Sequence, residues 1–332
     1  MCKLNPLWAA LTLCCALALS LALAACDKPQ RTDTGKIKAV ATIFAYYDIL
    51  RAVGGSHVDA VILIPPKTTP HEFDPSIQTR TEVSQAKLIV KNGLMLDDWV
   101  DKLAQGNRDA KIINIAQQIS AKPLNTAEVA LDTPSTANAT QHKDEHKDEP
   151  KDAHKEDHHE HGAGNPHIWL DPTIQIQAAG LIRDALIQID PRNGEAYKYN
   201  AAEYIRSLQQ LDADFQTAVA KFATKEFIGF HSAYDYLAQR YGLKQIAALE
   251  EYPEQGVTVA QAQRIIALIK DKNIKVLFTE SALPSKDADL IVRQTGVKLA
   301  VLQPLETYDN VSDTYLSLMR QNLTNLHDAL GK

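Results

Sequence analysis

The sequence predicts an α/β protein with two similar lobes, each a parallel sheet flanked by helices, and one long helix between them. Three observations support this fold class. Short β-rich runs alternate with amphipathic stretches from Lys36 to about Ser120, the alternation returns after residue 224, and a helical pattern of about 30 residues lies between. The chain has 332 residues, of which 45% are hydrophobic, so it is long enough for two lobes of ordinary size.

Residues 1–25 have the composition of a secretory signal peptide: Lys3 precedes an apolar run, and the small residues before Cys26 resemble a bacterial lipobox. We therefore expect this leader to be removed, Cys26 to carry a lipid, and residues 26–35 to form a linker. The alternative is a permanent transmembrane anchor, although the run is near the lower length limit for a span. No disulfide is available to the rest of the chain, because the four cysteines lie in this leader or at its end: Cys2, Cys14, Cys15 and Cys26.

Residues 36–172 are expected to form the first lobe. Runs rich in β-branched residues predict strands, and the stretches between them have apolar residues at helical spacing. The expected strands are 36–44, 57–64, 87–93 and 111–115. The expected helices are 46–55, 76–85 and 96–105. Because strands alternate with helices, the sheet should be parallel with crossover connections.

A histidine-rich acidic insertion interrupts this lobe at about residues 136–164. It has almost no apolar side chains, so it buries too little surface to fold and is expected to be disordered. Imidazoles interleaved with carboxylates attract divalent cations such as zinc. We therefore expect weak, auxiliary metal binding by six histidines: His142, His146, His154, His158, His159 and His161.

Residues 173–223 are expected to be helical, with one helix over 173–189 and the long helix from 194 to about 223, which has no proline. At 1.5 Å per residue the long helix would span roughly 45 Å and could act as a rigid strut. Residues 224–332 should form the second lobe. Its expected strands are 226–230, 243–249, 274–280 and 297–302, and its expected helices are 233–242, 259–273, 288–296 and 311–330.

Three histidines outside the insertion are candidates for a firm metal site, because each lies in a turn between regular elements. His71 lies in a loop stiffened by prolines after an expected strand. His167 lies in GNPHIWLDP, where Trp169 and Leu170 should anchor the segment in a core. His231 directly follows an expected strand, at the carboxyl edge where open α/β sheets bind ligands.

Asp309, which follows the last expected strand, is the favoured fourth ligand. Glu306, Glu72 and water are the alternatives, and Asp309 also fits ordinary turn and capping chemistry before a helix. Three neutral imidazoles with one carboxylate or water suit tetrahedral zinc, whereas manganese prefers more oxygen ligands. The sequence therefore predicts a Zn²⁺ site.

Five motifs, together with the leader, resemble the metal-binding lipoproteins of bacterial ABC importers, and the zinc-uptake type in particular. In order they are PHEFDPS, NGLMLDDWVDKL, NPHIWLDP, FHSAYDYLAQRYGL and FTES, so the resemblance covers nearly the whole mature chain. It implies two lobes joined by a long helix, with the metal in the cleft between them. It also implies ligands at His71, His167 and His231, with an acidic residue near Asp309 in the variants that use one. Manganese members of the family carry glutamate where His231 stands, and some zinc members have a disulfide that this chain cannot form.

The expected function is therefore high-affinity zinc binding outside the membrane and delivery of Zn²⁺ to an importer's permease and ATPase, without enzyme activity. A manganese or other divalent-metal lipoprotein, or an adhesin without transport, is one alternative. A zinc hydrolase is another, but Pro75 stands where a helix-borne metalloprotease motif starting at His71 would need its second histidine.

Asp27, directly after Cys26, resembles the signal that keeps enterobacterial lipoproteins on the inner membrane. We therefore expect a lipid-anchored monomer on the periplasmic face of the inner membrane, or on the outer face of the cell membrane if the host has a single membrane. The net charge is −6, and no basic region indicates a nucleic-acid partner.

Overall fold

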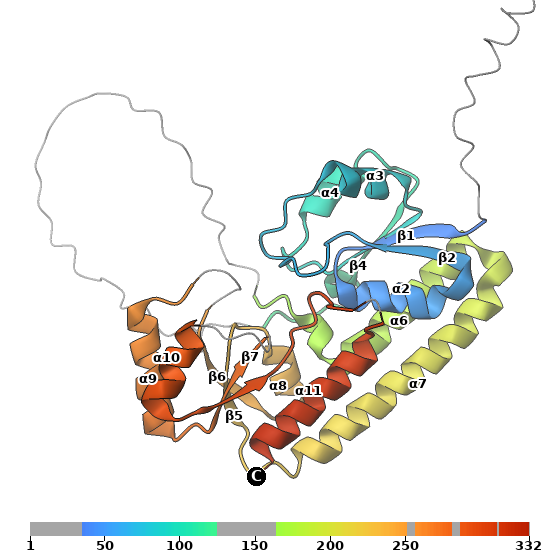
Figure 1. The fold of residues 1–332 in the computed structure, drawn as a ribbon. Coiled ribbons are helices and arrows are strands. Elements are labelled where there is room, and N and C mark those ends of the chain that lie inside the picture. Colours follow the sequence, from blue (N-terminus) through green and yellow to red (C-terminus); the bar gives the residue numbers. More distant parts are fainter. Residues whose placement is uncertain (1–34, 125–163, 251–255, 281–285, 311, 332) are drawn as a thin grey trace, which may run out of the picture. The chain divides into compact units, whose positions relative to one another are not determined.

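Two parallel four-stranded sheets, each flanked by helices, organise the chain (Figure 1). The computed structural model describes residues 35–124, 164–250, 256–280, 286–310 and 312–331. The expected signal peptide, Cys26, Asp27 and the six histidines of the insertion lie outside the described residues. Residues 37–332 group into one compact unit, which contains both sheets.

The first sheet has the strand order β2-β1-β3-β4, with every neighbouring pair parallel. Its strands are β1 (Ile37–Ala41), β2 (Val58–Ile62), β3 (Leu88–Lys91) and β4 (Lys111–Asn114). The helices that alternate with them are α2 (Phe44–Gly54), α3 (Ile77–Gln85), α4 (Trp99–Ala104) and the short α5 (Ile115–Gln118). The strands and longer helices expected from the sequence are confirmed, and each strand is shorter than its hydrophobic run. Helix α2 begins two residues before its expected start, and α4 begins three residues after its expected start.

The second sheet repeats this order as β6-β5-β7-β8, again with parallel pairs. Its strands are β5 (Glu226–Gly229), β6 (Lys244–Ala248), β7 (Val276–Thr279) and β8 (Lys298–Val301). Its helices are α8 (Asp235–Tyr241), α9 (Val259–Lys272), α10 (Lys286–Thr295) and α11 (Tyr315–Leu330). In each sheet the chain continues from a central strand first to one side and then to the other, which creates a switch point at the carboxyl edge where ligands bind.

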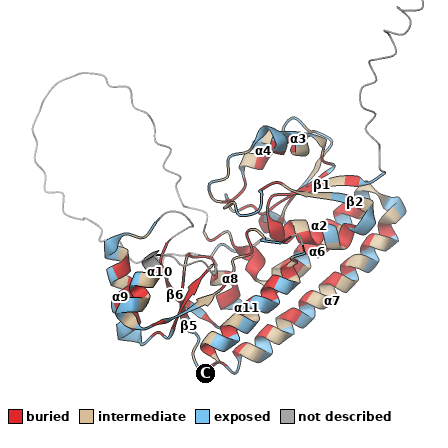
Figure 2. Cartoon of the chain, viewed as in Figure 1, coloured by how far each residue is buried: buried red, intermediate tan, exposed pale blue. Residues whose placement is uncertain are grey.

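Helices α6 (Pro172–Ile189) and α7 (Gly194–Val219) connect the two sheets along the chain. Helix α6 begins where expected, because Pro172 fits the first turn and the Asp171 side chain accepts a hydrogen bond from the Thr173 N–H. Helix α7 has 26 residues and buries one stripe at helical spacing, seen along one side of the helix in Figure 2. The members of this stripe are Tyr197, Ala201, Tyr204, Leu208, Leu211, Phe215 and Val219.

Three buried clusters account for the packing on the faces of the sheets. The largest is continuous from Ala39 and Leu88 of the first sheet, through Leu208 of α7, to Phe227 and Val276 of the second sheet. Two smaller clusters cover the opposite face of each sheet, one in each lobe. A continuous core between the sheets limits their relative movement, since separating them would expose apolar surface.

Two helices differ from the expected bounds. Helix α7 ends at Val219 and not near residue 223, because the backbone then tightens into a turn, in which the Lys221 N–H donates to the Ala218 carbonyl and the Phe222 N–H to the Val219 carbonyl. Helix α11 begins at Tyr315 and not at residue 311, because Thr314 and Ser317 form a reciprocal capping box that fixes its first turn.

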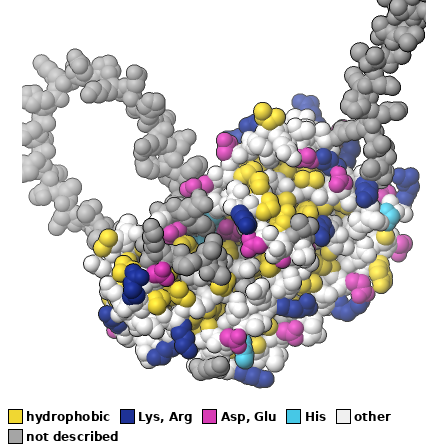
Figure 3. Space-filling view, in the orientation of Figure 1, with side chains coloured by type: hydrophobic (Ala, Val, Ile, Leu, Met, Phe, Trp, Pro, Cys, Tyr) yellow, Lys and Arg dark blue, Asp and Glu magenta, His cyan; other side chains and the backbone are white. Residues whose placement is uncertain are grey.

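The surface of the described residues has no dominant feature on the face shown in Figure 3, where positive and negative side chains are interspersed. The most exposed large apolar side chains, Ile77, Val259 and Tyr199, come from three different helices. Among the helices of the described part of the chain, none has the length and apolar character needed to cross a membrane.

Candidate metal site

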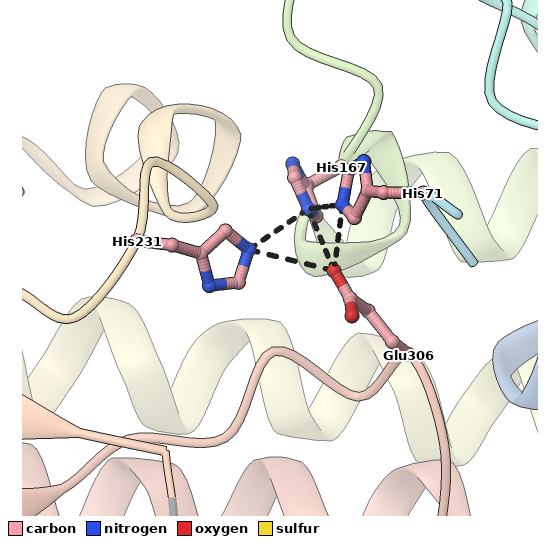
Figure 4. A group of neighbouring side chains, drawn as sticks. All are labelled: His71, His167, His231 and Glu306. Atoms are coloured by element: carbon pink, nitrogen blue, oxygen red, sulfur yellow. Dashed lines mark hydrogen bonds and ion pairs between the residues drawn. The ribbon is translucent and has the colours of Figure 1, made fainter. Parts of the chain in front are cut away.

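Four side chains from loops that are far apart in the sequence converge on one point (Figure 4). His71 lies in the loop after β2, His167 directly precedes a 3₁₀ turn (Ile168–Leu170), His231 follows β5, and Glu306 lies between β8 and α11. Each offers one ligand atom, and these four atoms lie within 4.8 Å of one another. The three histidines predicted from the sequence are thus brought together, with glutamate as the fourth member.

Five of the six distances between these atoms fit ligands of a tetrahedral ion. His167 Nε2 lies 3.3 Å from His71 Nε2, 3.2 Å from His231 Nε2 and 2.9 Å from Glu306 Oε1. Glu306 Oε1 lies 3.1 Å from His71 Nε2 and 3.4 Å from His231 Nε2. Ligands about 2.0–2.1 Å from a zinc ion at tetrahedral angles are about 3.3 Å apart, which is close to these separations.

The site is buried, and the pKa values of its side chains are shifted from their usual values. His231 is fully buried, the side chains of His167 and Glu306 are 2% and 6% exposed, and that of His71 is 15% exposed. Burial lowers the pKa of His167 to about 3, although Glu306 acts in the opposite direction. Burial alone would raise the pKa of Glu306, but its contacts with the three histidines hold that pKa well below its usual value. An ionised carboxylate beside neutral His167 is the state that a cation requires.

The loop that carries His71 is held from two sides. The ring of Phe73 packs 5.0 Å from that of Trp99 in α4, which anchors the loop to the first lobe. The backbone N–H of Lys67 donates to Thr307 Oγ1 at 2.9 Å, which ties the same loop to the residue after Glu306. Two ligands far apart in sequence are therefore connected by direct contacts of their own loops.

The segment that carries His167 is fixed by buried neighbours, as expected for Trp169 and Leu170, both of which are fully buried. The Trp169 indole N–H donates to the Pro304 carbonyl at 2.7 Å, and the Asn92 amide donates to the Pro166 carbonyl at 2.9 Å. Asn92 follows β3, so the carboxyl end of the first sheet sets the position of this ligand.

Asn165 determines which nitrogen of His167 faces the site. Its amide nitrogen donates to the Ser232 carbonyl at 2.9 Å and to Asp235 Oδ2 at 2.8 Å, so its Oδ1 is the acceptor. That Oδ1 lies 2.6 Å from His167 Nδ1, which must therefore carry the proton. His167 Nε2 is left with its lone pair directed to the other ligands.

His231 and Glu280 lie at the switch point of the second sheet. His231 follows β5 after one intervening residue, and Glu280 directly follows β7, the strand paired with β5. The Glu280 carboxylate is hydrogen-bonded to His231 Nδ1. Burial would lower the pKa of His231, but Glu280, with help from Glu306, raises it to about 10.

Glu306 is directed into the site by an unusual backbone and by contacts with the first lobe. The preceding residue, Leu305, is buried and has a φ of 55°, a left-handed conformation that non-glycine residues seldom adopt. The ring of Tyr308 lies 5.2 Å from that of Phe44 in α2. Although the sequence assigns Glu306 to the second lobe, its loop packs on the first.

Asp309, the fourth ligand favoured from the sequence, does not lie with the three histidines in the structure. Asp309 is exposed and outside the cluster, and the backbone N–H groups of Asp309 and Asn310 both donate to Asp313 Oδ2. Asp309 therefore belongs to the turn before α11, which is the turn chemistry that the sequence also allowed for this residue. Glu72 is exposed and also outside the cluster, whereas Glu306, the other alternative, occupies the fourth position.

Sequence reasoning did not identify two supporting residues, Asn165 and Glu280. Both stand in motifs that were noted, NPHIWLDP and FTES, but sequence alone gives no sign that their side chains reach a histidine ring. The only available signal was position, since Glu280 follows a strand at the same sheet edge as His231.

Comparison with known proteins finds relatives that are named for zinc uptake and zinc binding. The model of the family described as "Zinc-uptake complex component A periplasmic" matches residues 39–329. The chain is 29% identical over 324 residues to the high-affinity zinc uptake system protein ZnuA of Bacillus subtilis (strain 168), covering 94% of this chain and 95% of that protein. It is 30% identical over 305 residues to the zinc-binding protein AdcA of Streptococcus pyogenes serotype M3, covering 90% of this chain and 57% of AdcA.

A solved structure of a zinc-binding protein is also similar to this chain. The Zn(II)-bound ZnuA-like domain of Streptococcus pneumoniae AdcA matches with a TM-score of 0.70 and 26% identity, covering 90% of this chain and 100% of that domain. The two-lobed α/β fold and the resemblance to zinc-uptake proteins are thus confirmed, and the alternative of a zinc hydrolase is not supported. With a family model that matches nearly the whole of the described unit, the chain belongs to the zinc-uptake complex component A family.

Proposed function

We propose that this chain captures zinc for an ABC importer, and that His71, His167, His231 and Glu306 bind the ion. The observation that carries the proposal is the buried group of four ligand atoms within 4.8 Å of one another, five of whose six separations are between 2.9 and 3.4 Å. Such a preformed set binds without a large ordering cost. No bound water is required to complete a four-coordinate ion.

The ligand types favour zinc over manganese as the cargo. Three imidazoles and one carboxylate form a nitrogen-rich, four-coordinate site, which suits zinc. Manganese favours oxygen ligands and octahedral coordination, and the cluster offers carboxylate oxygen only from Glu306. His231 is the position that matters most for this choice, because a glutamate there would change the balance of nitrogen and oxygen.

The chain acts as the solute-binding component of its importer, so a membrane permease and an ATPase are its partners. We further propose a lipid anchor at Cys26, a monomeric state, and a position on the periplasmic face of the inner membrane when the host has two membranes. The support is the lipobox-like leader and Asp27, together with the relatives' names.

The histidine-rich insertion is proposed to bind zinc weakly and to raise its local concentration near the firm site. Support comes from the described residues at its two ends. The Asn165 N–H donates to the Leu124 carbonyl at 2.8 Å, and the Tyr236 hydroxyl donates to the carbonyls of Lys122 and Asn165. The insertion is therefore joined to the fold two residues from His167.

A calorimetric zinc titration of the mature chain tests the site. We expect one tight binding event, which His71→Ala, His167→Ala or His231→Ala should each weaken by at least about 100-fold, more than is typical for second-shell substitutions. His57→Ala and His327→Ala remove histidines outside the cluster and should leave it unchanged. Retention of the tight event in all three ligand variants would refute the proposed site.

Deletion of residues 141–162 separates the insertion from the firm site. The tight event should remain, while weaker binding should disappear.

Importer function is tested by growth in chelated medium, where a strain lacking the gene should grow poorly unless zinc is added. A strain that carries the shortened chain is compared with the wild type in the same medium. If it grows like the wild type, and if the shortened chain binds the same number of zinc ions, the insertion has no part in zinc capture.

A further inference from the structure

Glu280 is an acidic residue outside the ligand group that contacts one of its histidines. Its carboxylate is hydrogen-bonded to Nδ1 of the fully buried His231, and its own side chain is 20% exposed. The other nitrogen of His231, Nε2, faces His167 and Glu306 (Figure 4). An ionised carboxylate can accept hydrogen bonds but cannot donate them. His231 Nδ1 must therefore carry the proton, and Nε2 remains the metal-binding nitrogen.

The fold builds this contact independently of any ligand. Strands β5 and β7 are paired through Ile228 and Leu277, so the residues that follow them meet at one sheet edge. The position of Glu280 relative to His231 therefore follows from strand pairing in the second sheet.

A comparison with His167 shows what is distinctive about Glu280. Both histidines have an acceptor at Nδ1, but Asn165 supplies a neutral amide oxygen and Glu280 supplies a carboxylate. Both contacts select the same tautomer. Only Glu280 adds a negative charge behind the ring.

The charge matters because the site is buried. A divalent ion with three neutral imidazoles and ionised Glu306 has a net charge of +1, and a net charge in a low-dielectric interior is unfavourable. The carboxylate of Glu280 brings the total to zero. Carboxylates hydrogen-bonded to a ligating histidine also increase the basicity of the ring.

We infer that Glu280 is a positioning residue for zinc, which orients His231 Nε2 toward the ion and supplies the second negative charge that neutralises the buried complex. This inference rests on the proposed zinc site. Glu280 would act through His231 and would not itself bind the ion. Its hydrogen bond and its negative charge are two separate effects.

Three variants separate these effects. Glu280→Gln keeps an oxygen acceptor but removes the charge, Glu280→Ala removes both, and Glu280→Asp restores the charge on a shorter side chain. Glu203→Gln, which removes an exposed carboxylate of α7, is the matched control. Zinc affinity is measured by competition with a fluorescent chelator, and folding of each variant by circular dichroism.

After correction for the protons released on binding, we expect Glu280→Gln to weaken zinc binding by about 10–100-fold, Glu280→Ala by at least as much, and Glu280→Asp by less than either. Glu203→Gln should bind like the wild type. Nitrogen-15 NMR of the metal-free protein gives a readout that a merely structural role would not move: His231 Nδ1 should be fully protonated in the wild type and only partly protonated in Glu280→Ala.

Wild-type affinity in Glu280→Gln would overturn the charge role, and wild-type affinity with an unchanged tautomer in Glu280→Ala would overturn the positioning role. Equal losses in Glu280→Asp and Glu280→Ala would also contradict the charge role. Failure of the zinc site itself is distinguishable, because then the wild-type chain would show no tight binding.

Discussion

At the scale of single residues, the two best-buried histidines of the site are in opposite protonation states. Burial keeps the pKa of His167 at about 3, so this ring is neutral at physiological pH. Glu280 outweighs the burial of His231 and raises its pKa to about 10, so this ring holds an additional proton in the metal-free protein. A metal must displace that proton to reach Nε2.

Zinc binding should therefore release about one proton from His231 at pH 8. Because the pKa of His231 is raised, its proton is bound throughout the range below about pH 10, and zinc affinity should increase with pH by about tenfold per unit there. Calorimetry in buffers with different ionisation enthalpies gives the number of protons released. His57→Gln should show the same number, and a binding enthalpy independent of the buffer would contradict the prediction.

The identity of the fourth ligand is a second question at this scale. Glu306→Ala should weaken zinc binding by more than about 100-fold, because it removes a ligand and the only carboxylate within the cluster. Asp309→Ala is the matched control, since Asp309 is exposed and outside the cluster. Competition titrations compare the two variants. A larger effect of Asp309→Ala would restore the assignment made from sequence.

At the scale of elements, Asp48 connects three helices beside the site. It lies in α2, is 4% exposed, and its Oδ2 accepts hydrogen bonds from the Tyr204 hydroxyl of α7 and the Tyr315 N–H of α11, both at 3.0 Å. Burial raises the pKa of Asp48 despite these bonds. One carboxyl group thus couples the long helix to the last helix and to the first lobe.

Asp48 should make the stability of the metal-free protein depend on pH. Its folded-state pKa is above the unfolded value of about 3.9, so its contribution is present below that value and is lost as pH rises through the folded-state pKa. Asp48→Asn can keep both acceptor bonds without titrating, and should be at least as stable as the wild type at neutral pH. Asp48→Ala loses both bonds and should cost about 1–3 kcal/mol.

Urea unfolding between pH 4 and pH 8 measures this effect. The difference in unfolding free energy between Asp48→Asn and the wild type should grow as pH rises and then become constant. A difference that does not change with pH would show that Asp48 does not titrate in this range.

At the scale of the whole molecule, the site draws ligands from both halves of the chain, while the core beneath it is continuous. His71 and His167 come from segments linked to the first sheet, and His231 from the end of β5 in the second. The loop of Glu306 comes from the second lobe in sequence and packs on α2 of the first. A bound ion would therefore join parts of the chain that are far apart in sequence.

Zinc should accordingly stabilise the whole unit. At a free concentration 100 times the dissociation constant, binding to the folded state alone adds about 2.7 kcal/mol. With an unfolding entropy of about 2.1 cal/mol/K per residue, this corresponds to an increase in Tm of roughly 4 °C for the unit formed by residues 37–332. Thermal unfolding with zinc and with a chelator measures the shift, and His231→Ala should abolish most of it. An equal shift in His231→Ala would place the stabilising ion elsewhere.

The sequence by itself determined the elements and most of the site. The hydrophobic periods located the strands and long helices, because burial of one face imposes a spacing of two or of about 3.6 residues. The turns after strands located His71 and His231, and the bulky residues beside His167 distinguished it from the histidines of the insertion. These are local properties, which neighbouring residues encode.

Only the tertiary structure decided between Glu306 and Asp309, and only it identified Asn165 and Glu280. Both acidic candidates follow β8 and have similar chemistry, and the choice depends on the left-handed backbone of Leu305 and on contacts with the first lobe. The contact of Glu280 with His231 depends on the pairing of β5 with β7, whose residues are about 50 positions apart. Such contacts arise from long-range packing, which the local pattern of residues does not encode.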